Sequence, residues 1–480
     1  MRRLTLTTLC ALVWLQAAAA QADDGRAALN RIYSPQERER LLSLKSLTLE
    51  TQVSAFGMRG GGVSHFAAPD RFTVTYILPL LTVTQTYNAG SGWMIDQNGA
   101  VTPLSGSDLQ ALVTQIYFSG YAFLREDDSS QIELIGASER TGRGCLDFHI
   151  TPSGGLPVDV SIDSATGDIL FARVFKDDIS MDVTYGDFRD VDGHQIPFAV
   201  TTVASTPLLN MSESVSAAHV NPQLDPVLFA PPAAGREAAG SRRADFAFPT
   251  ETTSITAPLE YRDGHVFVRV RVNGSRPLRM LLDSGAGVSA LTRATVDSLG
   301  LTTVGELPGK GISGYTAVGL VRIEKFALGD LTLLDRSVGA IDLPAEMQAA
   351  LGGIDGIIGF ELLHAFAVQL DFTQQTLTVF HPEKTPETFP GFALPVTFTM
   401  KVPTVEATIG SASGSFLVDI GNQTGVVIHR AFAVHVGLDT LPSQTITGQR
   451  AVSGIGGSTV VREVYLPSLR LDTAIFRDTP

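Results

Sequence analysis

The chain has 480 residues, more than one hydrophobic core normally organises, so two or three domains are expected. Apolar residues make up 44% and charged residues 18% of the sequence, as in ordinary globular proteins, while 46 Gly and 25 Pro favour strands and turns. The formal net charge of −14 argues against nucleic acid or an anionic membrane as a partner, because both are bound through Lys and Arg.

The N-terminus is predicted to be a cleaved targeting segment. Arg2 and Arg3 precede an apolar stretch over residues 4–20, and Ala20-Gln21-Ala22 has the small-x-small pattern of a cleavage site. We therefore expect a signal peptide over residues 1–22 and a periplasmic or secreted mature chain. No other apolar run reaches the roughly 20 residues that span a bilayer, so no transmembrane segment is expected in the mature chain. Cys145 is the only cysteine outside the removed segment, and an internal disulfide is excluded.

Residues 23–232 are predicted to form one β domain with a helix at its start. Ser34 and Glu37 make a plausible capping box for a helix that ends near Leu44. After this helix, apolar and polar residues alternate in several runs, which is typical of strands. Turn residues at 163–168 and at Asp192-Gly193 separate these runs. One large antiparallel sheet is expected.

The order of these strands and turns resembles the half-barrel of periplasmic lipoprotein-carrier and outer-membrane lipoprotein-sorting proteins. The resemblance rests on a D-x-x-T-G turn that starts at Asp163, a Y-G-D-F-R-x-V-D-G-x-x-I-P run from Tyr185, and a closing LFAPPA from Leu228. It implies a concave apolar surface for a hydrophobic ligand, an acyl chain or an extended peptide. An ordinary sheet packed on its own helix is an equal alternative.

Residues 233–256 are rich in Ala, Gly, Ser and Thr and are predicted to be a linker. Strands resume near residue 257 with a hairpin whose turn is Asn273-Gly274. The next strand delivers Asp283 to a loop that contains Gly285. A carboxylate that follows an apolar strand is either a turn cap or a working acid, because burial of its charge is costly.

A second copy of this pattern favours the working acid. Residues 416–438 repeat residues 278–301, with Asp419 and Gly421 in the places of Asp283 and Gly285. Further along, residues 452–454 correspond to residues 312–314. An internal duplication is the economical explanation, and two related carboxylates suggest a dyad.

The D-S-G-A signature at residues 283–286 is followed by a glycine-bearing loop at 311–314 and by Gly356-Ile357-Ile358-Gly359 before a further helix. Over residues 258–382 this resembles the retropepsin-like aspartyl proteases of bacterial exported proteins. The resemblance implies a mainly β chain with two acid-protease lobes, residues 257–385 and 392–480, after the N-terminal half-barrel. It also implies an aspartic endopeptidase.

The resemblance assigns roles to individual residues. Two carboxylates in hydrogen-bond reach share one proton, so Asp283 and Asp419 are the expected catalytic pair. Gly285 and Gly421 let the two loops approach, Ser284 joins a hydroxyl network behind the dyad, and Ala286 completes the loop. The residues expected to form the flap over the substrate are Gly311, Ile312, Ser313, Gly314 and Tyr315.

The second copy departs from the family pattern. Ile420 stands where Thr or Ser is expected, and nothing after it matches residues 356–372. The second lobe is therefore expected to be incomplete, either because the sequence is truncated or because a partner chain or another packing supplies the missing elements.

The predicted reaction is hydrolysis of a peptide or protein substrate by activated water, without metal or cofactor. Glu361 and His364 lack the second histidine of a zinc motif. Two alternatives remain open. One is a homodimer whose dyad is Asp283 from two chains, and the other is a non-catalytic periplasmic protein that binds lipid or peptide.

Overall fold

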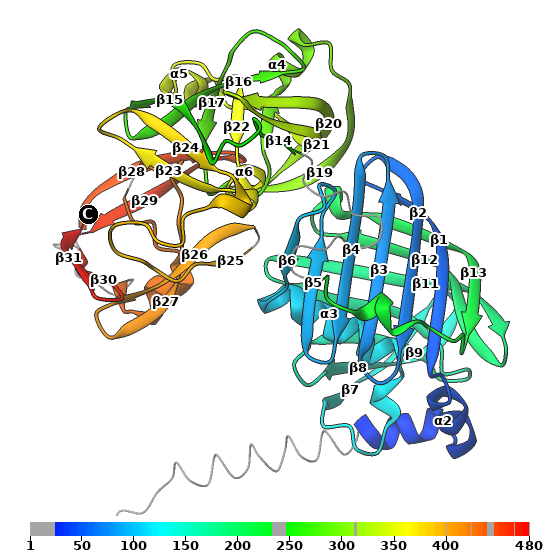
Figure 1. Cartoon of the computed structure of the whole chain (residues 1–480). Coiled ribbons are helices and arrows are strands. Elements are labelled where there is room, and N and C mark those ends of the chain that lie inside the picture. The colour runs from blue at the N-terminus through cyan, green and yellow to red at the C-terminus, as the bar shows by residue number, and fades with distance from the viewer. Residues whose placement is uncertain are drawn as a thin grey trace, which may run out of the picture. The chain divides into compact units, whose positions relative to one another are not determined.

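The computed structural model describes residues 25–232, 246–311, 314–399, 401–423, 425–438, 446–464 and 466–479 (Figure 1). The chain divides into a first unit, residues 1–96 and 103–235, and a second unit, residues 97–102 and 236–480. The predicted signal peptide, residues 1–22, lies outside the described residues. Both units are built mainly from strands, as predicted.

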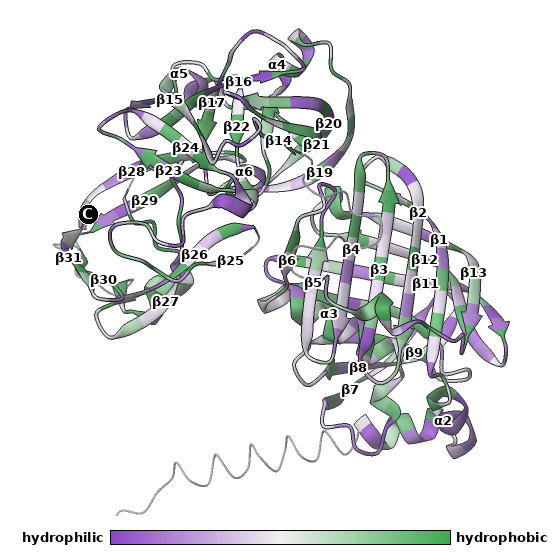
Figure 2. Ribbon diagram, viewed as in Figure 1, coloured by the Kyte–Doolittle hydropathy of each residue, from purple (hydrophilic) through white to green (hydrophobic). Residues whose placement is uncertain are grey.

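The first unit contains one 13-stranded sheet, and the strand pairings from β5 to β7 are antiparallel. Figure 2 shows hydrophobic and hydrophilic residues alternating along its strands, the pattern that the sequence led us to expect. In spatial order the strands are β6 (Val101–Pro103), β5 (Ser91–Ile95), β4 (Leu81–Asn88), β3 (Arg71–Leu78), β2 (Met58–Ala67), β1 (Ser46–Ala55), β13 (Met211–Val220), β12 (His194–Ala204), β11 (Ile179–Val191), β10 (Ile169–Lys176), β9 (Val158–Asp163), β8 (Arg143–Thr151) and β7 (Gln131–Arg140).

Short helices cover part of this sheet. The helical segments are a helix over residues 25–32, α2 (Pro35–Leu42), α3 (Gly106–Ser119), η1 (Ala122–Leu124), η2 (Pro207–Leu209) and η3 (Pro226–Phe229). Phe123 of η1 packs in one buried cluster with Phe148 and Ile150 of β8 and Val160 of β9. The sheet therefore shares a core with its helical cover. Cys145 is buried, and burial raises the pKa of its thiol.

The predicted local signals of the first unit are confirmed. Ser34 caps α2, and its side chain and that of Glu37 form both bonds of the capping box. Asp163 accepts hydrogen bonds from the N–H groups of Ala165 and Thr166 in the predicted turn. Asp192-Gly193, both with positive φ, joins β11 to β12.

The second unit begins with an 11-stranded sheet. Its strands run in the order β19 (Thr303–Gly311), β20 (Gly314–Leu328), β21 (Leu331–Ile341), β18 (Ala290–Thr292), β22 (Gly356–Ile358), β17 (Leu278–Leu282), β16 (His265–Val272), β15 (Ser254–Arg262), β24 (Thr376–Phe380) and β23 (Ala367–Asp371), with β14 (Phe246–Ala247) paired to β21. Four short helical segments belong to it: α4 (Arg293–Ser298), α5 (Ala345–Ala350), α6 (Phe360–Ala365) and η4 (Pro382–Lys384).

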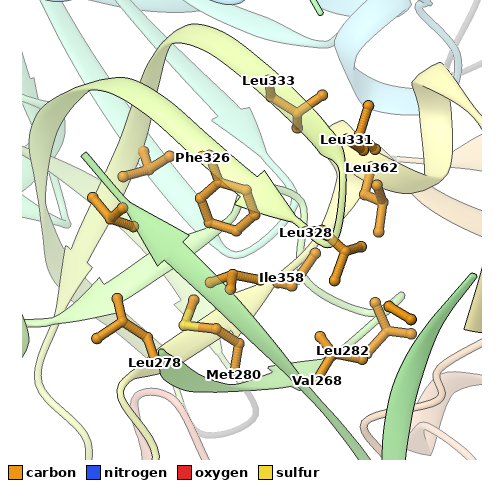
Figure 3. Packing of buried hydrophobic residues seen from close by; sticks show 14 of the residues in the cluster. Val268, Leu278, Met280, Leu282, Phe326, Leu328, Leu331, Leu333, Ile358 and Leu362 are labelled. Atoms are coloured by element: carbon orange, nitrogen blue, oxygen red, sulfur yellow. The ribbon is translucent and has the colours of Figure 1, made fainter. Parts of the chain in front are cut away.

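Strand β17 is buried on both faces, which explains its continuous apolar run. Its residues Leu278, Met280 and Leu282 point into one core with Phe326 and Ile358 (Figure 3). Leu281 packs in a second cluster on the opposite face. Strand β17 also pairs in parallel with β22, so the end of β17 is fixed by a neighbouring strand as well as by the cores on its two faces.

The predicted Asn273-Gly274 turn connects β16 to β17, and both residues have positive φ. The predicted linker, residues 233–256, contains β14 and the start of β15; residues 233–245 lie outside the described residues. The boundaries of the two lobes remain a prediction.

The later part of the second unit forms smaller sheets. Its elements are β25 (Thr397–Thr399), β26 (Val402–Ile409), β27 (Ala412–Leu417), α7 (Arg430–His435), β28 (Ile446–Gly454), β29 (Gly457–Val464), β30 (Leu466–Leu471) and β31 (Ala474–Thr479). Strand β27 pairs with β26, and no described strand pairs with its other edge. In the parts of the chain that the structure describes, no helix has the length and hydrophobicity to cross a bilayer.

Candidate active site

Asp283 follows the last residue of β17 directly. Its backbone N–H donates to the carbonyl oxygen of Ile358, 2.9 Å away, which continues the parallel pairing with β22. Its carboxylate Oδ1 accepts from the N–H of Gly285 at 2.8 Å. The buried strand thus fixes the position of the acid, and the loop orients its carboxylate.

Asp419 is held by a loop of the same local geometry. The N–H of Gly421 donates to Asp419 Oδ1 at 2.8 Å. The N–H of Asn422 lies 3.3 Å from the carbonyl oxygen of Asp419, just as the N–H of Ala286 lies 3.3 Å from that of Asp283. The repeat predicted from sequence therefore extends to individual hydrogen bonds.

The two loops face each other reciprocally. A Cβ atom added to Gly285 would lie 2.6 Å from Cγ of Asp419, and one added to Gly421 would lie 2.6 Å from Cγ of Asp283. Neither position can hold a side chain without displacing the opposite carboxyl group. Asp283 and Asp419 also share a side-chain hydrogen bond.

The electrostatics follow from this proximity. Burial raises the pKa of Asp283 to about 7, with further contributions from the charge of Asp419 and the hydrogen bond between them; the N–H groups of Gly285 and Ala286 oppose the rise. Two carboxyl groups in such contact titrate as a pair. A pKa of about 7 keeps the Asp283 carboxyl group largely protonated below neutral pH, beside the carboxyl group of Asp419.

A single hydroxyl group ties the two loops together. Ser284 Oγ donates to the carbonyl oxygen of Val418 at 2.6 Å and accepts from the N–H of Ile420 at 2.9 Å. Ile420 has no hydroxyl group with which to return these bonds, and its side chain packs against the core cluster of β17. The side-chain hydrogen bonds between the two loops are therefore made by Ser284 and not by Ile420.

The two acids differ in exposure. Asp283 is half-buried and Asp419 is exposed. Before Asp283, Leu281 and Leu282 are 2% and 0% exposed, whereas before Asp419, Leu417 and Val418 are 48% and 38% exposed. Among the described strands, none covers the apolar run before Asp419 in the way that β22 covers the run before Asp283.

Two hairpins meet at their tips. The predicted flap is the β19–β20 hairpin, in which Gly311 pairs with Gly314 and Lys310 with Tyr315; Ile312 and Ser313 lie outside the described residues. The β28–β29 hairpin is its counterpart in the second copy. A Cβ atom added to Gly311 would lie 1.6 Å from the carbonyl oxygen of Ile455, and one added to Gly456 would lie 2.9 Å from that of Gly314, so the two tips leave no room for side chains at these glycines. Sequence reasoning had noted the repeated motif without placing this contact.

Sequence reasoning also missed the contacts behind the Asp283 loop. Glu361 Oε2 accepts from the N–H and the hydroxyl group of Ser289, at 2.8 and 2.6 Å. Ser289 Oγ accepts from the N–H of Gly359, and Ala286 O accepts from that of Phe360, both at 3.0 Å. No local pattern signals a contact between residues 72 positions apart.

A metal site was not expected. Among the described residues, no group of three or more His, Cys, Asp or Glu side chains is arranged to hold a metal ion. The site consists of two carboxyl groups, backbone N–H donors and one bracing hydroxyl group.

Comparisons with known proteins bear on both units. Curated protein sequences give no significant match. A DUF1329 family protein from Desulfovibrio piger is 12% identical, and the match covers 44% of this chain and 97% of that one, with a TM-score of 0.33. A putative outer membrane lipoprotein-sorting protein domain from Vibrio parahaemolyticus is 10% identical over 42% and 95%, with a TM-score of 0.32.

A retropepsin-like aspartic protease from Rickettsia conorii is 19% identical, over 28% of this chain and 94% of that one, with a TM-score of 0.20. Residues 268–362 match the aspartyl protease family. The segment that carries Asp283 is therefore similar to aspartyl proteases.

Proposed function

We propose that the chain is an aspartic endopeptidase whose catalytic pair, Asp283 and Asp419, is formed within one molecule. The observation that carries this proposal is the reciprocal approach of Gly285 to Asp419 and of Gly421 to Asp283. If Asp283 only capped a turn, it would need hydrogen bonds to the backbone of its own loop, but it would not need a second carboxyl group at hydrogen-bond distance. The opposed carboxyl groups and the raised pKa of Asp283 support the working acid instead.

The proposed mechanism uses the singly ionised pair. Its carboxylate takes a proton from a water molecule, while the protonated partner hydrogen-bonds to the peptide carbonyl oxygen and transfers its proton to that oxygen as the new C–O bond forms. Water then adds to the carbonyl carbon to give a gem-diol, with no covalent bond to the protein. The carboxyl group that took the proton from water then gives it to the amine nitrogen, while a gem-diol hydroxyl group returns a proton to the other carboxylate. The C–N bond breaks, the two products leave, and the pair again shares one proton.

The surroundings support this chemistry in two ways. The N–H groups of Gly285 and Gly421 hold the carboxylate oxygens, and Ser284 ties the loops so that the acids keep their separation. The flap hairpin, with Gly311, Gly314 and Tyr315, and its counterpart around Ile455 are proposed to lie over the bound peptide. They would exclude water other than the attacking molecule.

The intramolecular dyad distinguishes this proposal from a homodimer of Asp283 lobes. Asp419 occupies the place that the second Asp283 would take, which favours a site complete in one chain. Cleavage of a mixed peptide library between about pH 3 and 7, the range in which carboxyl pairs titrate, tests the activity. A specific activity independent of protein concentration supports the single-chain site, and one that falls on dilution supports the homodimer.

We further propose a periplasmic or secreted location, on the basis of the sequence of residues 1–22. The hydrophobic ligand of the first unit, and with it the non-catalytic binding role, remains a prediction from the resemblance. Mass spectrometry of the mature N-terminus after expression with the full leader tests the location. An uncleaved Met1 would contradict it.

A further inference from the structure

The loop that carries Asp283 is fixed at both ends by one corner of the fold, residues 358–361, where β22 turns into α6. At its start, the N–H of Asp283 donates to Ile358 O. In its middle, Ala286 O accepts from Phe360 N–H. At its end, Ser289 accepts from Gly359 N–H and donates twice to Glu361. Only the last of these attachments depends on side chains.

Glu361 is an unusual residue for its surroundings. It lines a small cavity with Ser289, Arg336 and several apolar side chains, namely Phe326, Leu333, Val338, Ile358 and Leu362. Burial raises the pKa of Glu361, and its hydrogen bonds with Ser289 and the charge of Lys401 act in the opposite direction. A position needed only for packing would favour another apolar residue, because burying a carboxyl group is costly. The two donors of Ser289 give a reason for a carboxyl group here.

The same turn of α6 also contacts the second lobe. The ring of Phe360 packs edge-to-face on that of Phe398 in β25, with centroids 5.8 Å apart. Lys401 Nζ lies 5.4 Å from the Phe360 ring centroid. The first turn of α6 therefore contacts the Asp283 loop on one side and the second lobe on the other.

We propose that Glu361 is a positioning residue for peptide hydrolysis: by holding Ser289 it fixes the Asp283 loop at the distance from Asp419 that the shared proton requires. This inference rests on the proposed function. Asp283 must not retreat into its own lobe or swing toward solvent, since misplacement by about 1 Å can cost roughly 100-fold in rate. The Asp419 loop is held at its start by the N–H of Val418, which donates to the carbonyl oxygen of Pro403 at 2.7 Å, so the position of Asp283 relative to Asp419 depends on the attachment of its own loop as well.

The test compares Glu361→Ala with Glu361→Gln in the full-length mature protein. The Gln amide oxygen can still accept from Ser289, whereas Ala removes the acceptor. We expect Glu361→Ala to lower kcat by roughly 10- to 100-fold with KM changed less than threefold, and Glu361→Gln to retain most of kcat. Glu346→Ala, at an exposed position on α5, is the matched control.

Hydrogen–deuterium exchange provides a readout that does not need activity. Amides of residues 283–289 should exchange at least tenfold faster in Glu361→Ala than in wild type, and near the wild-type rate in Glu361→Gln. Ser289→Ala, which removes the hydroxyl contacts with both Glu361 and Gly359, should show the same acceleration. If Glu361→Ala fails to fold, the exchange measurement on Ser289→Ala tests the same attachment.

Different results would overturn the two claims separately. If wild type cleaves and Glu361→Ala retains full kcat, or if Glu361→Gln is as impaired as Glu361→Ala, the positioning role is wrong. Unchanged exchange over residues 283–289 in both Ala variants would also refute it. If wild type cleaves nothing, the proposed function fails, while the exchange data still decide whether Glu361 fixes the loop.

Discussion

Replacing Asp283 by Asn should make the second unit less sensitive to rising pH. The pKa of Asp283 rises from its ordinary 3.8 to about 7 in the folded protein, first because it is buried and then because Asp419 is close. Between these two values the folded state binds more protons than the unfolded state. The free energy of unfolding of wild type therefore falls as pH rises through this window, and Asn removes this dependence.

The size of the effect follows from the shift. Each pKa unit corresponds to about 1.4 kcal/mol, so a rise to about 7 corresponds to at most about 4 kcal/mol. Asp283 is half-buried and shares its proton with Asp419, so about 2 to 4 kcal/mol is the range we expect. For a unit of this size that is a change of roughly 5–10 °C in Tm between pH 4 and pH 8.

Differential scanning calorimetry of wild type and Asp283→Asn at the two pH values measures the difference. The chain has two tryptophans, Trp14 in the predicted signal peptide and Trp93 in β5, so tryptophan fluorescence of the mature protein reports the first unit alone. This transition should be equal in the two proteins. Asp330→Asn, at an exposed turn between β20 and β21, controls for loss of a carboxylate.

A calorimetric difference between wild type and Asp283→Asn that is the same at pH 4 and pH 8 would refute the reasoning. It would mean that Asp283 titrates alike in the folded and unfolded chain. The carboxyl pair would then not be in the contact that the reciprocal glycines describe.

Three further predictions concern the same pair. Ser284→Ala leaves the N–H of Ile420 without its acceptor and should lower the free energy of unfolding by about 1–3 kcal/mol. Ser284→Thr keeps the hydroxyl group and should lower it less. Denaturant titration of both variants measures the difference. Gly421→Ala forces the Asp283 carboxyl group to move and should lower kcat at least tenfold in a peptide-cleavage assay. Gly186→Ala is the control, because a Cβ atom at Gly186 meets no neighbour within 4 Å, and it should leave kcat unchanged. Activity should fall as pH rises through about 7, because the pair loses the shared proton; kcat that increases between pH 7 and pH 9 would contradict this assignment.

The features that could be predicted from the sequence depend on residues that are close together along the chain. The Asn273-Gly274 turn, the buried run of β17 and the glycines after each aspartate are signals within a few residues of one another. The duplication supplied the second acid. Together they predicted that this region is mainly β and suggested Asp283 and Asp419 as a pair.

Long-range contacts account for what the sequence could not reveal. Glu361 contacts Ser289 across 72 positions, and the ring of Phe398 in β25 contacts that of Phe360 in α6. The apolar run that ends at Val418 resembles the one before Asp283, yet it is exposed because no described strand covers β27. Its burial depends on a neighbouring strand that periodicity does not encode.

Peptide cleavage by Asp283→Asn and Asp419→Asn, each alone and in equimolar mixture, tests the central claim most directly. In the proposed site both acids belong to one chain, so both variants and their mixture should be inactive while wild type cleaves. Activity in Asp419→Asn alone would show that Asp283 works with its copy in a second chain. Activity in Asp283→Asn would contradict the assignment of this residue to the catalytic pair.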